Sequence, residues 1–129
     1  MIFYTDEESR ALRTAVYGAM VLVSHADPGP VVEERFAGLR AMVNLPRELR
    51  DVLGAARVRL PEGSPEDVEN AVLEALRRSM KILTAKAPEE ADVFPSAVVA
   101  ICREVASADG HVADAEDEMV TKVRAALTV

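Results

Sequence analysis

Residues 106–127 read ASADGHVADAEDEMVTKVRAAL, and this stretch decides the fold that the sequence predicts. An apolar helix is expected to run into it and to stop at Asp109-Gly110, because glycine readily adopts the positive φ that ends a helix. Asp114 can then accept hydrogen bonds from the free N–H groups of a second helix, and Glu116 favours the positive end of that helix. The stretch therefore predicts two helices joined by an acidic turn.

A second version of this turn lies near the N-terminus. The five residues VSHAD, which end at Asp27, resemble the five residues VASAD, which end at Asp109. Glu34 follows Asp27 at the spacing at which Glu116 follows Asp109. The sequence thus predicts two helix–turn–helix units of one kind, packed so that their acidic turns share one end of the molecule.

The composition favours one compact helical domain over residues 1–129. A chain of 129 residues is one domain by the usual prior and buries about two-thirds of the surface that its unfolded form exposes. Half of the residues are hydrophobic, Trp is absent and aromatic residues make up only 4%. The core is therefore expected to consist of Val, Leu, Ala and Met, of which Ala and Leu favour helices.

The charge balance excludes two classes of partner. The formal net charge is −7, from 15 basic and 22 acidic residues, whereas wrapping nucleic acid or binding an anionic membrane requires a basic surface. The single cysteine cannot form an internal disulfide, which suits a reducing cytosol. Residues 1–8 lack the basic region of a signal peptide, and the longest apolar run, residues 15–23, is shorter than the ~20 residues of a transmembrane helix. A cytoplasmic protein, not an integral membrane protein, is expected.

Capping residues and prolines mark the predicted helices. Thr5 and Glu8 form a capping-box pattern, and Ser64 followed by Pro65 is a strong helix start. The other predicted helices begin near Pro30, Pro46, Pro95 and Asp114, with a short helical turn at residues 89–94. Because no segment alternates apolar and polar residues as a strand does, the predicted class is all-α: a compact bundle of about six or seven helices with a pseudo-repeated helix–turn–helix.

Apolar residues recur at helical spacing within these segments. The residues predicted to face inward are Leu12, Val16, Ala19, Met20, Val23, Phe36, Leu39, Met42, Val43, Leu49, Val52, Leu53, Ala56, Val68, Val72, Leu76, Met80, Leu83, Val98, Ile101, Cys102, Val105, Met119, Val120, Val123 and Leu127. In the helix expected from Pro95, Val99 and Ala100 make the remaining sides apolar as well. This helix is therefore predicted to be the central and most buried one.

The paired turns offer four carboxylates to a cation: Asp27, Glu34, Asp109 and Glu116. From Asp109 onwards, the spacing of Asp, Gly, an apolar residue and Glu matches the second half of an EF-hand loop, but the first half lacks its ligands. Because Ca²⁺ prefers six or more oxygens, one turn alone supplies too few, and the metal hypothesis is a joint site for Ca²⁺ or Mg²⁺. The alternative is that these acids only cap helices. The sequence leaves both interpretations open.

The sequence offers no convincing catalytic group. His25 and His111 each lie near an Asp and can act in principle as a base or a ligand, but two histidines in exposed turns are typically solvated. Cys102 lies on an apolar helix face and is interpreted as a buried structural thiol. The sequence lacks Gly-rich phosphate loops, Cys/His metal spacings and nucleophile elbows. A protein without enzymatic activity is expected.

Charges cluster by sign along the chain. The basic clusters comprise Arg35, Arg40, Arg47, Arg50, Arg57 and Arg59, and then Arg77, Arg78, Lys81 and Lys86. The acidic clusters lie within residues 62–69 and 109–118. Two faces of opposite charge on one small domain can guide docking to a protein partner or the pairing of two copies, and a mixed, solvated surface is the plainer interpretation.

The C-terminal turn and the helix before it resemble the TerB family of tellurite-resistance-associated proteins. The matching residues are VAIC at 99–102, VASADGHV at 105–112 and Glu116. The family pattern is an apolar helix, Ala-Asp-Gly, an apolar residue and a Glu that opens the next helix, and it occurs twice in an all-helical domain. In the N-terminal copy of this chain, DPGP at 27–30 replaces Asp-Gly-x-apolar.

The resemblance implies a role in resistance to tellurite and other stress, with membrane-associated stress complexes as partners and no accepted reaction. It also implies a metal site at Asp109 and Glu116, and by extension at Asp27 and Glu34. The first functional hypothesis is therefore a non-enzymatic, TerB-like stress-response module that binds a divalent cation. The alternative is a protein-interaction or dimerisation scaffold with no bound ligand.

Overall fold

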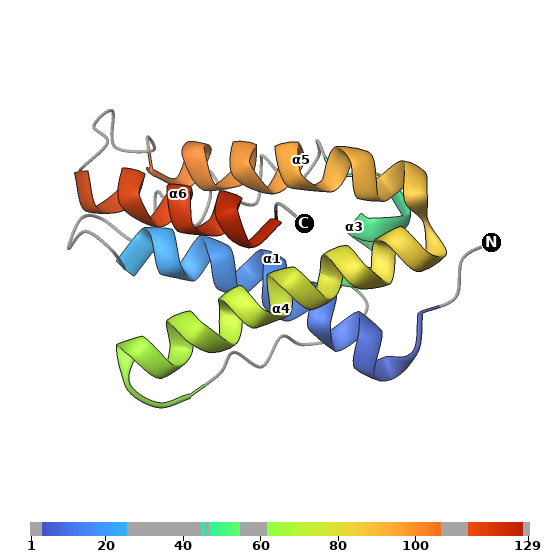
Figure 1. Cartoon of the computed structure of the whole chain (residues 1–129), viewed down its shortest axis with the longest axis horizontal. Coiled ribbons are helices and arrows are strands. Elements are labelled where there is room, and N and C mark those ends of the chain that lie inside the picture. Colours follow the sequence, from blue (N-terminus) through green and yellow to red (C-terminus); the bar gives the residue numbers. More distant parts are fainter. Residues whose placement is uncertain (1–3, 26–44, 46, 55–61, 107–113, 128–129) are drawn as a thin grey trace.

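The computed structural model describes residues 4–25, 45, 47–54, 62–106 and 114–127, and nearly all of them are helical (Figure 1). The helices are α1 (Asp6–His25), α3 (Arg47–Gly54), α4 (Pro65–Lys86), α5 (Pro88–Ala106) and α6 (Asp114–Leu127). These described ranges contain no β-strand, which confirms the all-α class. None of the described helices is both long and apolar enough to cross a bilayer.

The described residues form five helices, fewer than the predicted six or seven. One reason is that the helix predicted from Pro30 lies outside the described residues. The other is that the prediction of a new helix at Pro95 is wrong, because Pro95 lies inside α5. A proline there costs about 3 kcal/mol, since it lacks an N–H and crowds the preceding turn. The buried face of α5 continues past it, from Phe94 to Val98, and this burial offsets the cost.

α1 is the central helix, since it contacts α3, α4, α5 and α6. In Figure 1, α4 crosses α1, and α5 and α6 run side by side above it. The prediction that the helix around Ala100 would be the central one is wrong, although α5 is among the most buried of the described helices. α5 keeps one side at the surface, where Ala100 is half-buried and the Val93 side chain is 47% exposed.

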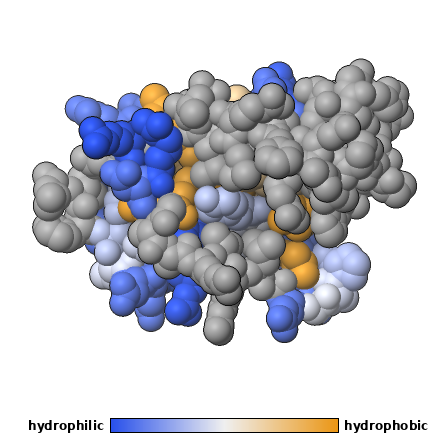
Figure 2. Space-filling model, turned by 180° about the vertical axis from the view of Figure 1, so that it is seen from behind, coloured by the Kyte–Doolittle hydropathy of each residue, from blue (hydrophilic) through white to orange (hydrophobic). Residues whose placement is uncertain are grey.

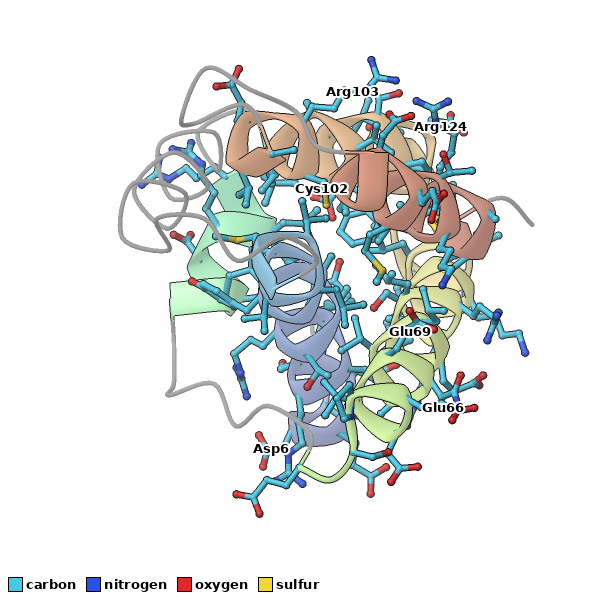
Figure 3. All side chains as sticks on the ribbon, turned by 90° about the vertical axis from the view of Figure 1, so that its left-hand side faces the viewer. Asp6, Glu66, Glu69, Cys102, Arg103 and Arg124 are labelled. Carbon is cyan, nitrogen blue, oxygen red and sulfur yellow. The ribbon has the colours of Figure 1, made fainter. Side chains whose placement is uncertain are left out.

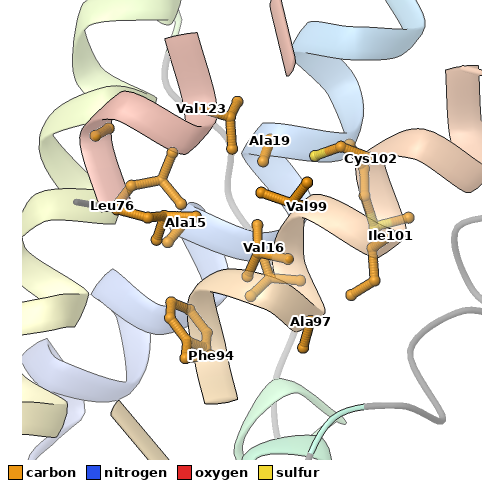
Figure 4. Close-up of a cluster of buried hydrophobic side chains, with 14 of the residues drawn as sticks. Ala15, Val16, Ala19, Leu76, Phe94, Ala97, Val99, Ile101, Cys102 and Val123 are labelled. Atoms are coloured by element: carbon orange, nitrogen blue, oxygen red, sulfur yellow. The ribbon is translucent and has the colours of Figure 1, made fainter. Parts of the chain in front are cut away.

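The core consists mainly of the predicted inward-facing residues, and Figure 4 shows how they meet. Ala15 and Val16 of α1 lie among Leu76 of α4, Phe94 of α5 and Val123 of α6. Ala15 and Phe94 are not among the predicted core residues. The predicted core residues of the described helices are buried, except for the half-buried Val52, Val68 and Met119. Outside the described residues lie Phe36, Leu39, Met42, Val43 and Ala56.

α1 and α4 come very close because small residues face α4. A Cβ atom added to Gly18 would lie 2.6 Å from Cγ2 of Val72, which is nearer than real Cβ contacts allow. Further along the same pair, the buried Ser79 hydroxyl donates its one proton mainly to the Ala75 carbonyl at 2.7 Å and shares it weakly with the Ala11 carbonyl of α1 at 3.4 Å. The buried hydroxyl is thus satisfied, and it joins the two helices.

Two predicted helix starts have the expected capping geometry. At α1, the Glu8 N–H donates to the Thr5 hydroxyl at 3.1 Å, and the Thr5 N–H donates to Glu8 Oε1 at 2.8 Å. At α4, the Asp67 N–H donates to Ser64 Oγ at 3.1 Å, and the Ser64 N–H donates to the Asp67 carboxylate at 3.4 Å. Each box satisfies backbone donors that a helix leaves free, so the local sequence fixes both starts.

A polar cluster fastens the start of α1 to the junction of α4 and α5. The Lys86 ammonium pairs with Glu8 and lies 5.9 Å from the centroid of the Tyr4 ring. The Tyr4 hydroxyl donates to Glu90 at 3.2 Å. The hydrogen bond from Lys86, followed by that from the Thr5 backbone N–H, lowers the pKa of the Glu8 carboxyl.

The close approach of α1 to α4 predicts that the effect of Gly18→Ala on stability changes sign when Val72 is also replaced. Gly18→Ala gains about 1 kcal/mol of helix propensity, but overpacking against Val72 costs roughly 1–3 kcal/mol. We expect a net loss in the free energy of unfolding. In a Val72→Ala background the two Cγ atoms that crowd the new Cβ are removed and only the Cβ of residue 72 stays near it, at 3.3 Å, so the same substitution should raise stability. Urea unfolding of the four proteins checks this, and a destabilising Gly18→Ala in both backgrounds would contradict the close contact.

The lowered pKa of Glu8 predicts a pH-dependent contribution to stability. A carboxyl whose pKa is lower in the folded state than in the unfolded state stabilises the fold. This contribution is fully present when the pH is above the ordinary pKa of about 4.3. It is lost as the pH falls through the lowered pKa of the folded state. We therefore expect Glu8→Gln to reduce the thermal midpoint at pH 7 and to have progressively less effect as the pH falls below about 4. The control is Glu7→Gln, since the Glu7 side chain is 83% exposed and pairs with Arg78 only at 3.7 Å. An equal effect of both substitutions would contradict the prediction.

Candidate functional site

The predicted metal ligands fall where the structure gives no side-chain description. Asp27, Glu34 and Asp109 lie outside the described residues. Glu116 belongs to α6, but its side chain is not among those described. Among the described residues, no group of three or more His, Cys, Asp or Glu side chains is placed to hold a metal ion. The joint cation site therefore stays a prediction.

The side chains of the two histidines that the sequence singles out are not described either. His25 is the last residue of α1, and its side chain is not described. His111 lies outside the described residues. A role for either imidazole stays a prediction of the sequence alone.

The helices that flank the two predicted turns meet at one end of the molecule. In Figure 1, the C-terminal ends of α1 and α5 and the start of α6 lie together at the left. A groove of about 550 Å³ gives independent evidence, because Val21 and Leu22 near the end of α1 and Met119 near the start of α6 line it together. The chain thus enters both predicted turns from the same end.

This groove between α1, α4 and α6 combines an apolar lining with acidic side chains, and we call it the acidic groove. Its described lining residues are Val21, Leu22, Gly63, Pro65, Glu66, Val68, Glu69 and Met119. Glu66 and Glu69 both lie in the first turns of α4 (Figure 3). The Lys122 ammonium of α6 lies 3.2 Å from Glu69 and so ties the wall on α6 to the wall on α4.

A second groove lies on the outer side of α5 and α6, and we call it the arginine groove. Its volume is about 360 Å³, and its described lining residues are Pro95, Ser96, Val99, Ala100, Arg103 and Arg124. Figure 3 shows Arg103 and Arg124 projecting from the same side of the molecule. Both guanidinium groups have interactions within the chain. Small and apolar residues therefore line the floor of the groove, and the two arginines make its edge positive.

Cys102 is a structural thiol, as the sequence predicts. It is fully buried in α5, and burial raises the pKa of the thiol to about 12. The thiolate is the nucleophilic form, and its population at neutral pH is negligible with such a pKa. Figure 4 shows Cys102 among the apolar side chains of the core.

Comparison with models of known protein families, with curated proteins and with solved structures gives no match in any of the three. The likeness to the TerB family therefore rests on the residues of the two turns and stays a prediction.

The two grooves are the features that sequence reasoning missed. Their walls come from helices far apart in the chain, such as Val21 and Met119, so no local motif marks them. One signal was available: α5 is apolar on more sides than its own chain covers, as Val93 and Ala100 show. On the face drawn in Figure 2, the described surface is mainly hydrophilic, with hydrophobic residues only in small areas.

The burial of Cys102 predicts slow thiol labelling. We expect iodoacetamide at pH 8 to leave the native protein unmodified over hours and to label it rapidly in urea, because labelling requires opening of the core. The matched control is Ala85→Cys in a Cys102→Ala background, which places an exposed thiol on the neighbouring helix α4. Mass spectrometry should find this control labelled within minutes. Equal labelling rates for the folded wild type and the folded control variant would show that Cys102 is accessible.

Proposed function

We propose that this protein is a non-enzymatic, TerB-like stress-response module that holds a divalent cation between two acidic turns. In this proposal the domain is a helical bundle of two related helix–turn–helix units in the cytoplasm. Asp109 and Glu116 supply oxygens from one turn, and Asp27 and Glu34 supply oxygens from the other. Ca²⁺ or Mg²⁺ is the expected ion, since both bind carboxylate oxygens.

One observation carries the proposal: the helices that lead into both turns converge at one end. Four carboxylates from one turn pair can jointly approach the oxygen count that a hard cation needs, whereas two cannot. The acidic groove adds Glu66 to this same end, and its negative charge favours a cation nearby, whereas Lys122 compensates the charge of Glu69.

A second candidate function is a protein-interaction scaffold without a bound ligand. It is favoured by the two grooves, each of which offers an apolar floor with charged residues of one sign at the edge. Grooves of this size accommodate side chains of a partner, and charges at the edge select partners of opposite sign. In this case the acids of the turns act only as helix caps.

Calorimetric titration tests the cation proposal. Ca²⁺, Mg²⁺, Mn²⁺ and Zn²⁺ are added separately to the chelator-treated protein, and we expect heat of binding for Ca²⁺ or Mg²⁺ that Asp109→Asn and Asp27→Asn each abolish. The matched control is Glu89→Gln, because Glu89 also lies in the first turn of a helix but on α5. Binding should also raise the thermal midpoint.

The outcomes separate the two functions. Heat that survives Asp109→Asn and Asp27→Asn, or that Glu89→Gln also removes, would indicate nonspecific binding to an acidic protein. The absence of heat for all four ions would overturn the cation proposal and leave the scaffold function.

A further inference from the structure

The outer face of α5 carries apolar surface that the described chain does not cover. Val93 is 47% exposed, and it is the one large hydrophobic side chain that is exposed among the described residues. Ser96 and the half-buried Ala100 follow it along the same face at helical spacing. The arginine groove opens beside these small residues, so the surface is hollowed where another helix can approach closely.

Charge changes sign along this face. Asp92 is exposed near the start of α5, and Arg103 is exposed near its end. They are 11 residues apart, which is close to three helical turns, so they lie on the same side of α5 and about 16 Å apart along it. Ser96 and Ala100 lie between them, one on each side of the midpoint of the segment from Asp92 to Arg103.

We propose that this face pairs with the same face of a second copy of the chain, with the two α5 helices antiparallel. A two-fold axis near the midpoint places Asp92 of each copy against Arg103 of the other, so one charge pair forms twice. Ser96 and Ala100 meet at the centre, where their small side chains allow close contact. The exposed Val93 lies on one flank of this contact and is partly covered at its edge.

The surrounding charges are compatible with this pairing. Arg103 interacts within its own chain, but a guanidinium carries five N–H donors and can serve a second carboxylate. Glu104 lies about 100° further round the helix than Arg103, on the flank that it shares with Val93. In the pair it therefore lies at the edge, beside Val93 of the second copy, and not against Asp92. Arg124 adds positive charge at the groove, where the second copy brings its acidic end.

The pairing specifies a partner for the charged surface of α5 and does not depend on the cation proposal. The pairing uses residues 92–103 of α5 and the cation proposal uses Asp27, Glu34, Asp109 and Glu116, so a metal titration and a dimer measurement test different side chains and can fail independently. An acidic peptide of another protein is the competing occupant. It would bind one copy and would not require reciprocal contacts.

Sedimentation equilibrium of the full chain tests the proposal with charge-swapped variants. We expect the wild-type protein to dimerise reversibly and more weakly as NaCl is raised, because salt screens the exposed pairs. Asp92→Arg alone and Arg103→Asp alone should each weaken the dimer at least about tenfold, since each places like charges together twice. The double variant restores both pairs and should dimerise as the wild type does.

A mixture of the two single variants gives the sharpest result. In a mixed dimer, the Arg introduced at position 92 meets the Asp introduced at position 103, and the native Arg103 meets the native Asp92. We therefore expect the mixture to form a heterodimer at concentrations where each variant alone is a monomer. Lys81→Asp is the matched control, because Lys81 is an exposed basic residue on α4, and it should leave the dimer unchanged.

Circular dichroism of each variant confirms that the helices are retained before its association is compared. A wild-type protein that stays monomeric at millimolar concentration would overturn the proposal. It would also be overturned if the mixture or the double variant failed to recover the dimer, because only reciprocal antiparallel contacts predict that recovery.

Discussion

The arrangement of the helices depends on how closely α1 approaches α4. Gly18 has no side chain, and Val72 occupies the space that a Cβ would need. Ser79 adds a polar tie between the same two helices through the Ala11 carbonyl. Because α1 also contacts α3, α5 and α6, any change in its distance to α4 would shift the surfaces on which those helices pack.

The polar ties of the described chain hold helices together and do not assemble a reactive centre. Lys86 and Glu8 join α4 to the start of α1, the Arg13 guanidinium donates to the Val52 carbonyl of α3 at 3.2 Å, and Lys122 joins α6 to Glu69. Each tie lies where two helices meet at the edge of the apolar core. The residues of the two proposals, for a cation and for a second copy, lie apart from these ties, at the surface and at the ends of helices.

α5 packs into the core with one face and carries the proposed dimer contact on the other. Its inner face buries Phe94 and Cys102, and this burial offsets the cost of Pro95 within the helix. Its outer face keeps Val93 exposed and carries opposite charges at its two ends. Opposite charges at the two ends of one exposed helix face can guide the docking of a partner.

The sequence by itself determined the helical class, the starts of α1 and α4, and most of the buried faces. Each of these follows from residues within one or two turns: Thr5 with Glu8, Ser64 with Asp67, and apolar side chains at helical spacing. It also predicted the four carboxylates of the two turns, which no described side chain tests. Only the tertiary structure decided that α1 is central, that Pro95 lies within a helix, and that two grooves open. The physical reason is that centrality, tolerance of a proline and groove walls such as Val21 with Met119 depend on burial between segments far apart in the chain, which local spacing does not encode.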